Sequence, residues 1–418
     1  MKRVPLFFLA VLFCMAAANA QKKPILFQHV RVFDGTQVLI NTNVLIENGE
    51  IKAIGPDVTA DSAEVVDGTG RTLLPGLIDS HAHVHGRDKL EQALDFGVTS
   101  EMDLGDPARF VQYLKSQVGD DCASFWSAGP LATVPGGHGA ERDPSAPTLV
   151  KPSEAEAWVE ARVREGSDYI KIVYDDGSER GRNVPTLSKA TMAALIAAAH
   201  KNHKLAIVHI GSLRGARDAI EAGADGLAHL FIGGHCDADF GQFAAAHHAF
   251  VIPTLTVHTA VCGPAAGPKL ISDPSLGPCL SRADKDRLRE EFPSARRGLS
   301  CQGQLEAIRQ LKAAGAPILA GSDVPNPGTA QGASLHQELE LLVEAGLTPI
   351  EALASATSAP ARAYHVPDRG RIAPGLRADL LLVAGHPDEN ILATRNIVAV
   401  YKHGIENKRR RCRPGAAN

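Results

Sequence analysis

One pattern dominates the chain from residue 77 onward: a short apolar stretch followed by a segment with helical spacing, repeated about eight times. Alternating strands and helices are typical of parallel α/β proteins, and eight such units favour closure of the strands into a barrel. The expected strands are 78–83, 98–104, 124–129, 169–174, 206–210, 226–230, 250–255 and 318–323. We therefore expect a barrel over residues 77–359. The longest insertion between its strands should span 256–316.

Both ends of the chain have β character instead. Short β-rich segments at 25–33, 37–47 and 52–54 are separated by Asp-Gly and Asn-Gly pairs, which favour tight hairpin turns. β texture returns at 370–372, 378–383 and 397–402. We expect residues 21–76 and 360–418 to pair into one small β domain beside the barrel.

The amino terminus has the pattern of a secretion signal. Lys2 and Arg3 precede an apolar run over 4–18, which ends in the small-x-small sequence Ala18-Asn19-Ala20. The run is shorter than the roughly 20 residues that cross a bilayer, which disfavours an uncleaved membrane anchor. We predict a signal peptide over residues 1–20 and a secreted or periplasmic mature protein.

Charge and cysteine content narrow the range of partners. With 43 Lys+Arg and 47 Asp+Glu, the formal net charge of −4 gives no basic surface for nucleic acid. Cleavage after residue 20 leaves six cysteines, an even number that permits disulfides in an oxidising compartment. Cys262, Cys279 and Cys301 lie in one Pro/Gly-rich region, and their pairing is open. Cys122, which opens an apolar strand, is expected to be a buried thiol.

The first candidate for chemistry is the pair His81 and His83 at the end of the first expected barrel strand. Residues i and i+2 of a strand project to the same side, so both imidazoles can bind one metal ion. Two histidines at this spacing are weak evidence alone, and two structural histidines are the alternative. Their position supports the metal-binding interpretation, because they follow the apolar run 73–78 at the expected carboxyl end of a strand.

Lys171 is unusual because it lies inside the apolar strand 169–173. An unpaired ammonium there carries a large desolvation cost, and burial lowers the pKa of lysine. A neutral amine can add carbon dioxide and become a carbamate, whose two oxygens can bridge two metal ions. The alternative is a core lysine in a salt bridge.

Three further strand ends carry side chains that can bind metal. His209 and His229 end the fifth and sixth expected strands, and Asp323 ends the eighth. Each histidine alone is more often a structural residue than a ligand. Five of eight strand ends nevertheless direct such groups to one rim, which is the face where barrels of this kind hold their active sites.

Several segments together resemble the amidohydrolase superfamily, in particular imidazolonepropionase-like enzymes and metal-dependent, prolidase-like dipeptidases. They are 75–83, 169–172, His209, 228–229, 321–323 and 372–380. The resemblance implies a (β/α)8 TIM barrel with a composite β-sandwich formed by both chain ends. It also implies that His81, His83 and Asp323 bind one metal ion, that His209 and His229 bind a second, and that carboxylated Lys171 bridges them.

This arrangement predicts hydrolysis of an amide bond in a small substrate, such as a dipeptide or an N-acyl amino acid. Two divalent ions that share a water molecule make hydroxide available near neutral pH, and one of them polarises the carbonyl. Asp323 can accept the proton of that water and return it to the leaving nitrogen. Zinc suits a shell of imidazole and oxygen ligands, while manganese and cobalt are alternatives.

Substrate contacts are expected from residues that follow other strands. His138, in the family-like loop 136–139, is expected to orient or polarise the substrate carbonyl, with loop stabilisation as the alternative. Tyr174 and His258 lie just past the fourth and seventh strands and are expected to touch substrate. His85 is expected to support the metal ligands. His247, His248 and His336 fall in helical segments and are expected on solvated faces.

Two segments depart from the family pattern: residues 175–177 after Lys171 and residues 210–212 after His209. They leave the exact substrate open. A cyclic-amide hydrolase and a deaminase with one metal ion are the alternative enzymes, although deaminases of this superfamily lack the bridging lysine. A non-catalytic binding protein would be expected to have lost ligands, and here all of them are present. Barrels of this kind often associate, so a homo-oligomer is also an open alternative.

Overall fold

The computed structural model describes residues 23–141, 145–293 and 298–412. The expected signal peptide, residues 1–20, lies outside the described residues. In these ranges no helix combines the length and the apolar character that crossing a membrane requires.

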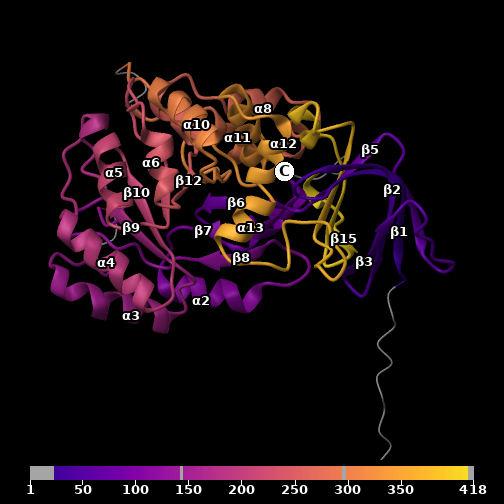
Figure 1. The fold of residues 1–418 in the computed structure, drawn as a ribbon, viewed down its shortest axis with the longest axis horizontal. Coiled ribbons are helices and arrows are strands. Elements are labelled where there is room, and N and C mark those ends of the chain that lie inside the picture. Colours follow the sequence, from indigo (N-terminus) through magenta and orange to yellow (C-terminus); the bar gives the residue numbers. More distant parts are fainter. Residues whose placement is uncertain (1–22, 142–144, 294–297, 413–418) are drawn as a thin grey trace, which may run out of the picture.

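The two chain ends build a single eight-stranded sheet. Its order is β15-β14-β13-β5-β1-β2-β3, with β4 paired to β1. The strands are β1 (Ile25–Phe33), β2 (Val38–Glu47), β3 (Glu50–Gly55), β4 (Glu64–Asp67), β5 (Arg71–Pro75), β13 (Leu380–Ala384), β14 (Ile397–Lys402) and β15 (Ile405–Glu406). β13 pairs antiparallel with β5, so the yellow carboxyl-terminal strands lie beside the indigo amino-terminal ones in Figure 1. The resemblance implied a composite β-sandwich here, and the structure assigns the strands of both chain ends to one sheet.

Seven of the eight expected barrel strands are present and parallel. Three form the sheet β6-β7-β8 and four form the sheet β12-β11-β10-β9. Their bounds are β6 (Leu77–Ala82), β7 (Val98–Asp103), β8 (Ser124–Ser127), β9 (Ile170–Tyr174), β10 (Ala206–Ile210), β11 (Gly226–Ala228) and β12 (Phe250–Ile252).

The eighth expected strand, 318–323, is not a strand in the structure. Its residues make isolated contacts on both sides: Ile318 bridges Val251 of β12, and the amide of Asp323 donates to the carbonyl of His81. Asp323 has a φ of 54°, outside the extended region, so regular pairing ends there. On the opposite side of the sheets, Ala132 bridges Ile172 of β9. The two parallel sheets are therefore linked through single bridges rather than continuous ladders.

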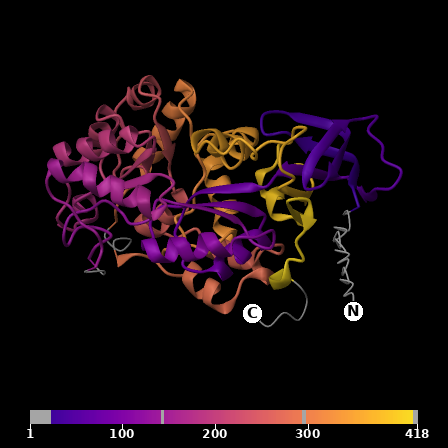
Figure 2. The same cartoon turned by 90° about the horizontal axis from the view of Figure 1, so that it is seen from below.

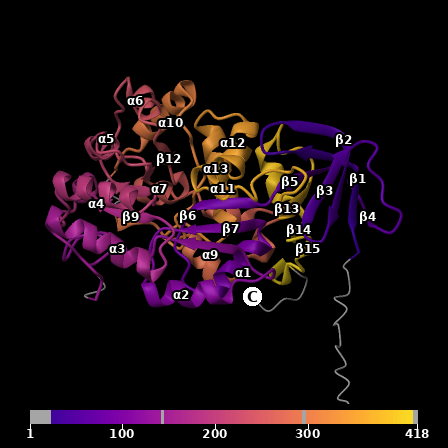
Figure 3. The same cartoon turned by 60° about the horizontal axis from the view of Figure 1, so that its bottom comes forward.

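Helices cover the parallel strands from outside, as Figures 1 and 3 show. They are α1 (Arg87–Asp95), α2 (Ala108–Gln117), α3 (Ala155–Glu165), α4 (Lys189–Lys201), α5 (Leu213–Glu221), α6 (Phe240–Ala246), α7 (Leu255–Cys262), α8 (Pro268–Ser272), α9 (Arg282–Leu288), α10 (Gln302–Ala314), α11 (Ala333–Glu344), α12 (Pro349–Ser355) and α13 (Ser358–Ala363). Short 3-10 turns include η2 (Ser178–Arg180), η3 (Gly277–Cys279) and η6 (Arg410–Cys412). Serine side chains cap helix starts, as Ser188 does for α4. The main apolar core lies between these helices and the strands.

One expected surface histidine is buried. His336 on α11 is only 1% exposed, and its ring bonds the Phe96 carbonyl and the Thr394 hydroxyl. The expectation of a solvated face was wrong because α11 is covered on this side by neighbouring chain segments that supply both partners. His247 and His248 are exposed as expected.

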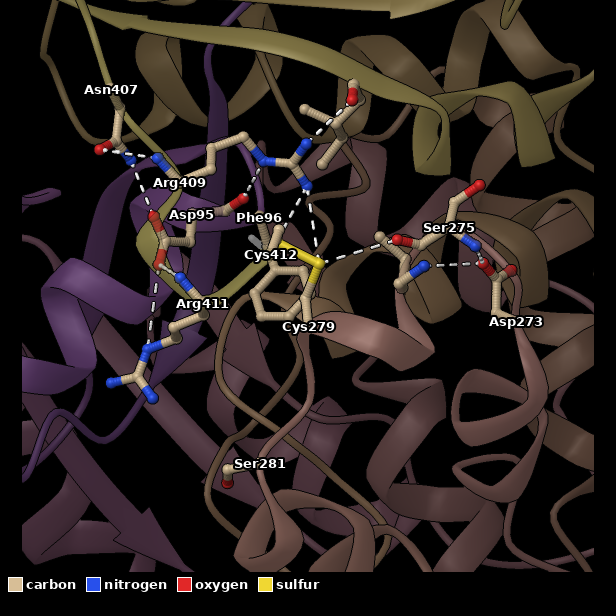
Figure 4. Close-up of a disulfide and its surroundings, with 12 residues drawn as sticks. Asp95, Phe96, Asp273, Ser275, Cys279, Ser281, Asn407, Arg409, Arg411 and Cys412 are labelled. Carbon is tan, nitrogen blue, oxygen red and sulfur yellow. Dashed lines mark hydrogen bonds and ion pairs between the residues drawn. A yellow bond between two sulfur atoms is a disulfide. The ribbon is translucent and has the colours of Figure 1, made fainter. Parts of the chain in front are cut away.

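The structure assigns the disulfides that the sequence left open. Cys262 pairs with Cys301, and Cys279 pairs with Cys412 near the end of the described chain. The second disulfide joins the carboxyl-terminal segment to η3. Figure 4 shows it beside the side chain of Arg409. Cys122 is a buried free thiol as expected, and Cys236 is another.

Candidate metal centre

The candidate ligands meet where the parallel strands end. Ligand atoms of His81, His229 and Asp323 all lie within 4.8 Å of one another, and all three side chains are buried. The residues come from β6, from the end of β11 and from the segment that follows the bridge at Ile318. Chain positions about 240 residues apart are therefore brought to one point.

Asp323 lies between the two histidines of the first strand. Its Oδ1 is 3.3 Å from Nε2 of His81 and 3.3 Å from Nε2 of His83. No hydrogen-bond donor among the described residues reaches this buried oxygen with bonding geometry. A buried carboxylate oxygen without a donor, facing two imidazole nitrogens, is the donor set that a divalent cation satisfies.

Lys171 lies beside the same group. Its Nζ is 3.5 Å from Nε2 of His81, and the residue is 2% exposed. Burial lowers the pKa of Lys171 to about 7, although the charges of Asp323 and Asp103 act in the opposite direction. A large share of this lysine is therefore neutral near pH 7, which is the form that adds carbon dioxide.

His209 and His229 are next to each other, with ring centroids 4.5 Å apart. The His229 ring is also 4.7 Å from that of His81. All five predicted histidine and lysine ligands and Asp323 thus lie in one connected cluster.

In His83 and His229, a neighbouring hydrogen-bond acceptor determines which ring nitrogen remains available to bind a metal ion. The His83 Nδ1 lies 3.1 Å from the Gly105 carbonyl, which can only accept. The His229 Nδ1 lies 2.7 Å from the Thr254 hydroxyl, which donates its own hydrogen to the Pro253 carbonyl. Both Nδ1 atoms must therefore carry hydrogen, and both Nε2 atoms keep the lone pair that binds a metal ion.

The backbone is strained at this centre. His229, Thr254 and Asp323 have φ values of 77°, 52° and 54°, in the left-handed region. Ala228 packs in the interior cluster of the strands, so regular alternation would turn the next side chain outward. With its positive φ, His229 departs from this alternation, and its side chain points into the cluster. Such conformations cost of order 1–3 kcal/mol each and concentrate at functional sites.

Electrostatics keep most of these imidazoles in their neutral, ligand-competent form. Burial first, and then the neighbouring Lys171 and histidines, hold the pKa values of His81, His209 and His229 well below the usual range. Burial also lowers the pKa of His83, but its interaction with the Asp323 carboxylate outweighs this effect and leaves the pKa raised.

The expected substrate-contact residues divide into two groups. The His138 ring centroid lies 4.8 Å from that of His209, and the His258 ring centroid lies 5.5 Å from that of His229. Tyr174 does not lie at the cluster. Its side chain points toward α5, where its hydroxyl donates to Asp218 at 3.1 Å. Lys171 points inward from β9, so the alternation of the strand turns Tyr174 outward.

His85 lies 3.7 Å from Asp106, at the edge of the centre rather than among the ligands. His138 lies 3.7 Å from Glu141, which also binds Arg182 at 2.7 Å.

Three supporting residues were missed by the sequence analysis. Asp79 accepts hydrogen bonds from the amides of His81 and Ser322, and thereby ties β6 to the segment that carries Asp323. Thr254 orients His229, and Asp175 lies against His209. The available signal for Asp79 was an acidic residue inside an otherwise buried strand, whereas Thr254 gave none.

Comparisons with known proteins agree with this geometry. The sequence profile of the Amidohydrolase family matches residues 72–405. An imidazolonepropionase of Cereibacter sphaeroides is 25% identical over 388 residues, which cover 85% of this chain and 92% of the relative. A solved Xaa-Pro dipeptidase with bound methionine shares the fold, with a TM-score of 0.74 and 22% identity over 92% of this chain and 99% of that one. A putative prolidase from Bifidobacterium longum superposes with a TM-score of 0.73 and 25% identity, over 95% and 97% of the two chains.

The chain belongs to the amidohydrolase family. It is accordingly a hydrolase that acts on carbon–nitrogen bonds, with the mixed α/β fold of its TIM-barrel-type neighbours.

Proposed function

We propose that the protein is an exported amidohydrolase with two metal ions that hydrolyses an amide bond in a dipeptide or an N-acyl amino acid. We also propose that the two parallel sheets and their linking segments form a (β/α)8 barrel over residues 77–359, beside a β domain from residues 21–76 and 360–418. The observation that carries the function is the convergence of a buried lysine with a pKa lowered to about 7, buried imidazoles and a carboxylate oxygen without a donor at one rim.

The residues divide into two sets around Lys171. His81, His83 and Asp323 would hold one divalent ion, His209 and His229 would hold the second, and the carbamate of Lys171 would bridge them. Zinc suits this mixture of imidazole and carboxylate ligands. Bound ions of this kind supply hydroxide near neutral pH and polarise a carbonyl oxygen.

Asp323 would act as the general base and then the general acid. Its buried Oδ1 is available to take a proton from the attacking water and to deliver it to the leaving nitrogen. The fixed positions of His81 and His83, each 3.3 Å away, hold that oxygen at the centre.

His258 is suited to bind a substrate oxygen. The Gln304 amide donates to the Phe231 carbonyl at 3.1 Å and to Nδ1 of His258 at 2.8 Å. Because Nδ1 accepts, the hydrogen of the neutral ring is on Nε2, which can donate to substrate. Burial lowers the pKa of His258 to about 4, which keeps this neutral form at physiological pH.

Export has independent support in the two disulfides, Cys262–Cys301 and Cys279–Cys412, since disulfides persist in oxidising compartments. The predicted signal peptide over residues 1–20 would supply the route.

A single-metal cyclic-amide hydrolase is the second candidate. Ligand atoms of His229 group with His81 and Asp323, as one shared ion would require. Imidazolonepropionases are also among the similar proteins.

Metal counting combined with a substrate panel separates the two candidates. The zinc-loaded mature protein should contain two ions per chain and turn over dipeptides or N-acyl amino acids in preference to lactams. Lys171→Ala should retain one ion and lose activity, while Lys189→Ala, on the exposed start of α4, should match the wild type. One ion per chain with an active Lys171→Ala variant would favour the second candidate. Turnover of lactones alone would contradict both.

Asp323→Asn provides the test of proton transfer. Removing a general base and acid is expected to lower kcat by about 10²–10⁴-fold. Undiminished kcat in this variant would refute the role of Asp323.

A further inference from the structure

Asp175 is a buried carboxylate that directly follows β9 and lies against His209. Its Oδ2 is 3.4 Å from Nε2 of His209, and its Oδ1 accepts the amide of Gly177 at 2.9 Å. Arg180, in the turn η2, forms an ion pair with Oδ2.

We infer that Asp175 is a positioning residue for His209, an inference that rests on the proposed metal-binding role of this histidine. The carboxylate lies 3.4 Å from Nε2 of His209 without full hydrogen-bond geometry, and a small rotation of the ring would let it accept from Nε2–H. This leaves Nδ1 as the nitrogen whose lone pair can bind a metal ion. Carboxylates that accept from the second nitrogen of a metal-binding histidine fix its tautomer and ring orientation, and they raise its basicity.

The local fold builds this contact. β9 and β10 pair in parallel with Tyr174 opposite Ile210, so Asp175 and Gly211 are neighbours at the strand ends. A Cβ atom at Gly211 would lie 2.3 Å from Oδ1 of Asp175 and 2.7 Å from its Cγ. Only glycine at 211 leaves the carboxylate enough space.

Two buried polar groups need partners here: Nε2 of His209 and the charged carboxylate of Asp175. Nε2 of His209 is buried and has no partner with full hydrogen-bond geometry among the described residues, and the Asp175 carboxylate, 3.4 Å away, is the acceptor that faces it. The guanidinium of Arg180 compensates the charge of the carboxylate and holds it in place. The chain Arg180–Asp175–His209 therefore resembles the second-sphere support of known metal histidines.

The test measures zinc affinity by competition with a chromophoric chelator, independently of activity. Asp175→Ala should weaken binding of the ion that His209 and His229 would hold by about 10–100-fold. Asp175→Asn keeps an acceptor oxygen and should recover part of that affinity. Asp176→Ala is the matched control, because the adjacent exposed carboxylate also accepts a turn amide, that of Ser178, without reaching His209. It should bind zinc as the wild type does.

A double-mutant cycle isolates the pathway through His209. His209→Ala should weaken zinc, and adding Asp175→Ala should change affinity by less than about twofold further. Unchanged affinity in Asp175→Ala, or an equal loss in the His209→Ala background, overturns the positioning role while leaving the proposed function intact. Unchanged affinity in His209→Ala overturns both. If Asp175→Ala fails to fold, Arg180→Gln replaces it and should weaken zinc binding by less than about tenfold relative to the wild type. Wild-type affinity in Arg180→Gln would then overturn the inference.

Discussion

Histidines in this protein show how one residue type serves different purposes according to its partners. His229 has one nitrogen engaged and one free at the cluster. His336 has both nitrogens engaged, by the Phe96 carbonyl and the Thr394 hydroxyl, and is a structural residue. Because both of its nitrogens are engaged, His336 has no lone pair to offer a metal ion, although it is as buried as the candidate ligands.

His336 predicts a specific acid sensitivity. Burial lowers its pKa to about 4 from the usual 6.5. Between these pH values the unfolded chain binds a proton that the folded protein does not, so this contribution to stability is complete above pH 6.5 and is lost on acidification toward pH 4. The full effect is about 3 kcal/mol.

The measurement is the free energy of unfolding in urea at several pH values. His336→Gln should show a shallower loss between pH 6.5 and 4 than the wild type. His247→Gln, at an exposed position, should follow the wild-type profile. Parallel wild-type and His336→Gln profiles would exclude the assigned role.

Residue spacing predicted which side chains gather at the centre better than it predicted their surroundings. The strand-end positions of His81, Lys171 and His209 follow from local apolar runs, which are visible in the sequence. The contact between Asp175 and His209 depends on how two strands align, and the outward turn of Tyr174 depends on which face of β9 is interior. These are properties of packing that a single sequence does not reveal.

At the scale of elements, the strands were predicted more reliably than their connections. β10 and β14 have the expected bounds, because each is a compact apolar run. β4 and β5 were missed since they are short and lie next to turns. The segment 318–323 has the composition of a strand, but a few backbone hydrogen bonds and one bridge join it to its neighbours instead of a continuous ladder.

The two disulfides predict different contributions to stability. Cys279–Cys412 spans 133 residues of chain and Cys262–Cys301 spans 39. A longer closed loop restricts the unfolded chain more, so the first bond should stabilise by about 1 kcal/mol more than the second in the chain-entropy account.

Paired substitutions measure this difference without leaving a free thiol. The variant Cys279→Ala/Cys412→Ala should lose more free energy of unfolding in urea than Cys262→Ala/Cys301→Ala, each under non-reducing conditions. A larger loss from the shorter loop would show that local packing, not loop length, controls the effect.

At the scale of the whole molecule, a buried ion pair joins the chain-end sheet to the parallel strands. Lys402 on β14 binds Asp379 at 2.7 Å, and its Nζ also donates to the Thr99 carbonyl and the Ser124 hydroxyl. Both charged side chains are almost fully buried. Figures 2 and 3 show the yellow carboxyl-terminal strands between the indigo strands and the rest of the molecule. The hydrogen bonds of Lys402 to Thr99 and Ser124 connect β14 with β7 and β8.

Lys402→Met should destabilise the protein by about 1–3 kcal/mol, because Asp379 loses one buried cation while Arg369 and Arg377 still pair with it. Thermal unfolding monitored by circular dichroism checks this loss. Lys52→Met, an exposed position on β3 of the same sheet, is the control and should change stability by less than about 0.5 kcal/mol. Equal melting temperatures for the two variants would contradict the linking role.

The composite architecture was predictable because turn signals and β-rich runs mark both chain ends. The disulfide partner Cys412 and the buried network at Lys402 were not, since each joins segments far apart in the chain and has no local signature.

The central claim is that the strand-end side chains hold two divalent ions on either side of a carboxylated lysine. Anomalous diffraction from crystals grown with zinc, recorded above and below the zinc absorption edge, tests it most directly. The expected result is two peaks, one beside His81, His83 and Asp323 and one beside His209 and His229, with added density on the Lys171 amine between them. A map without zinc peaks at these residues, or with one peak and an unmodified Lys171, would contradict it.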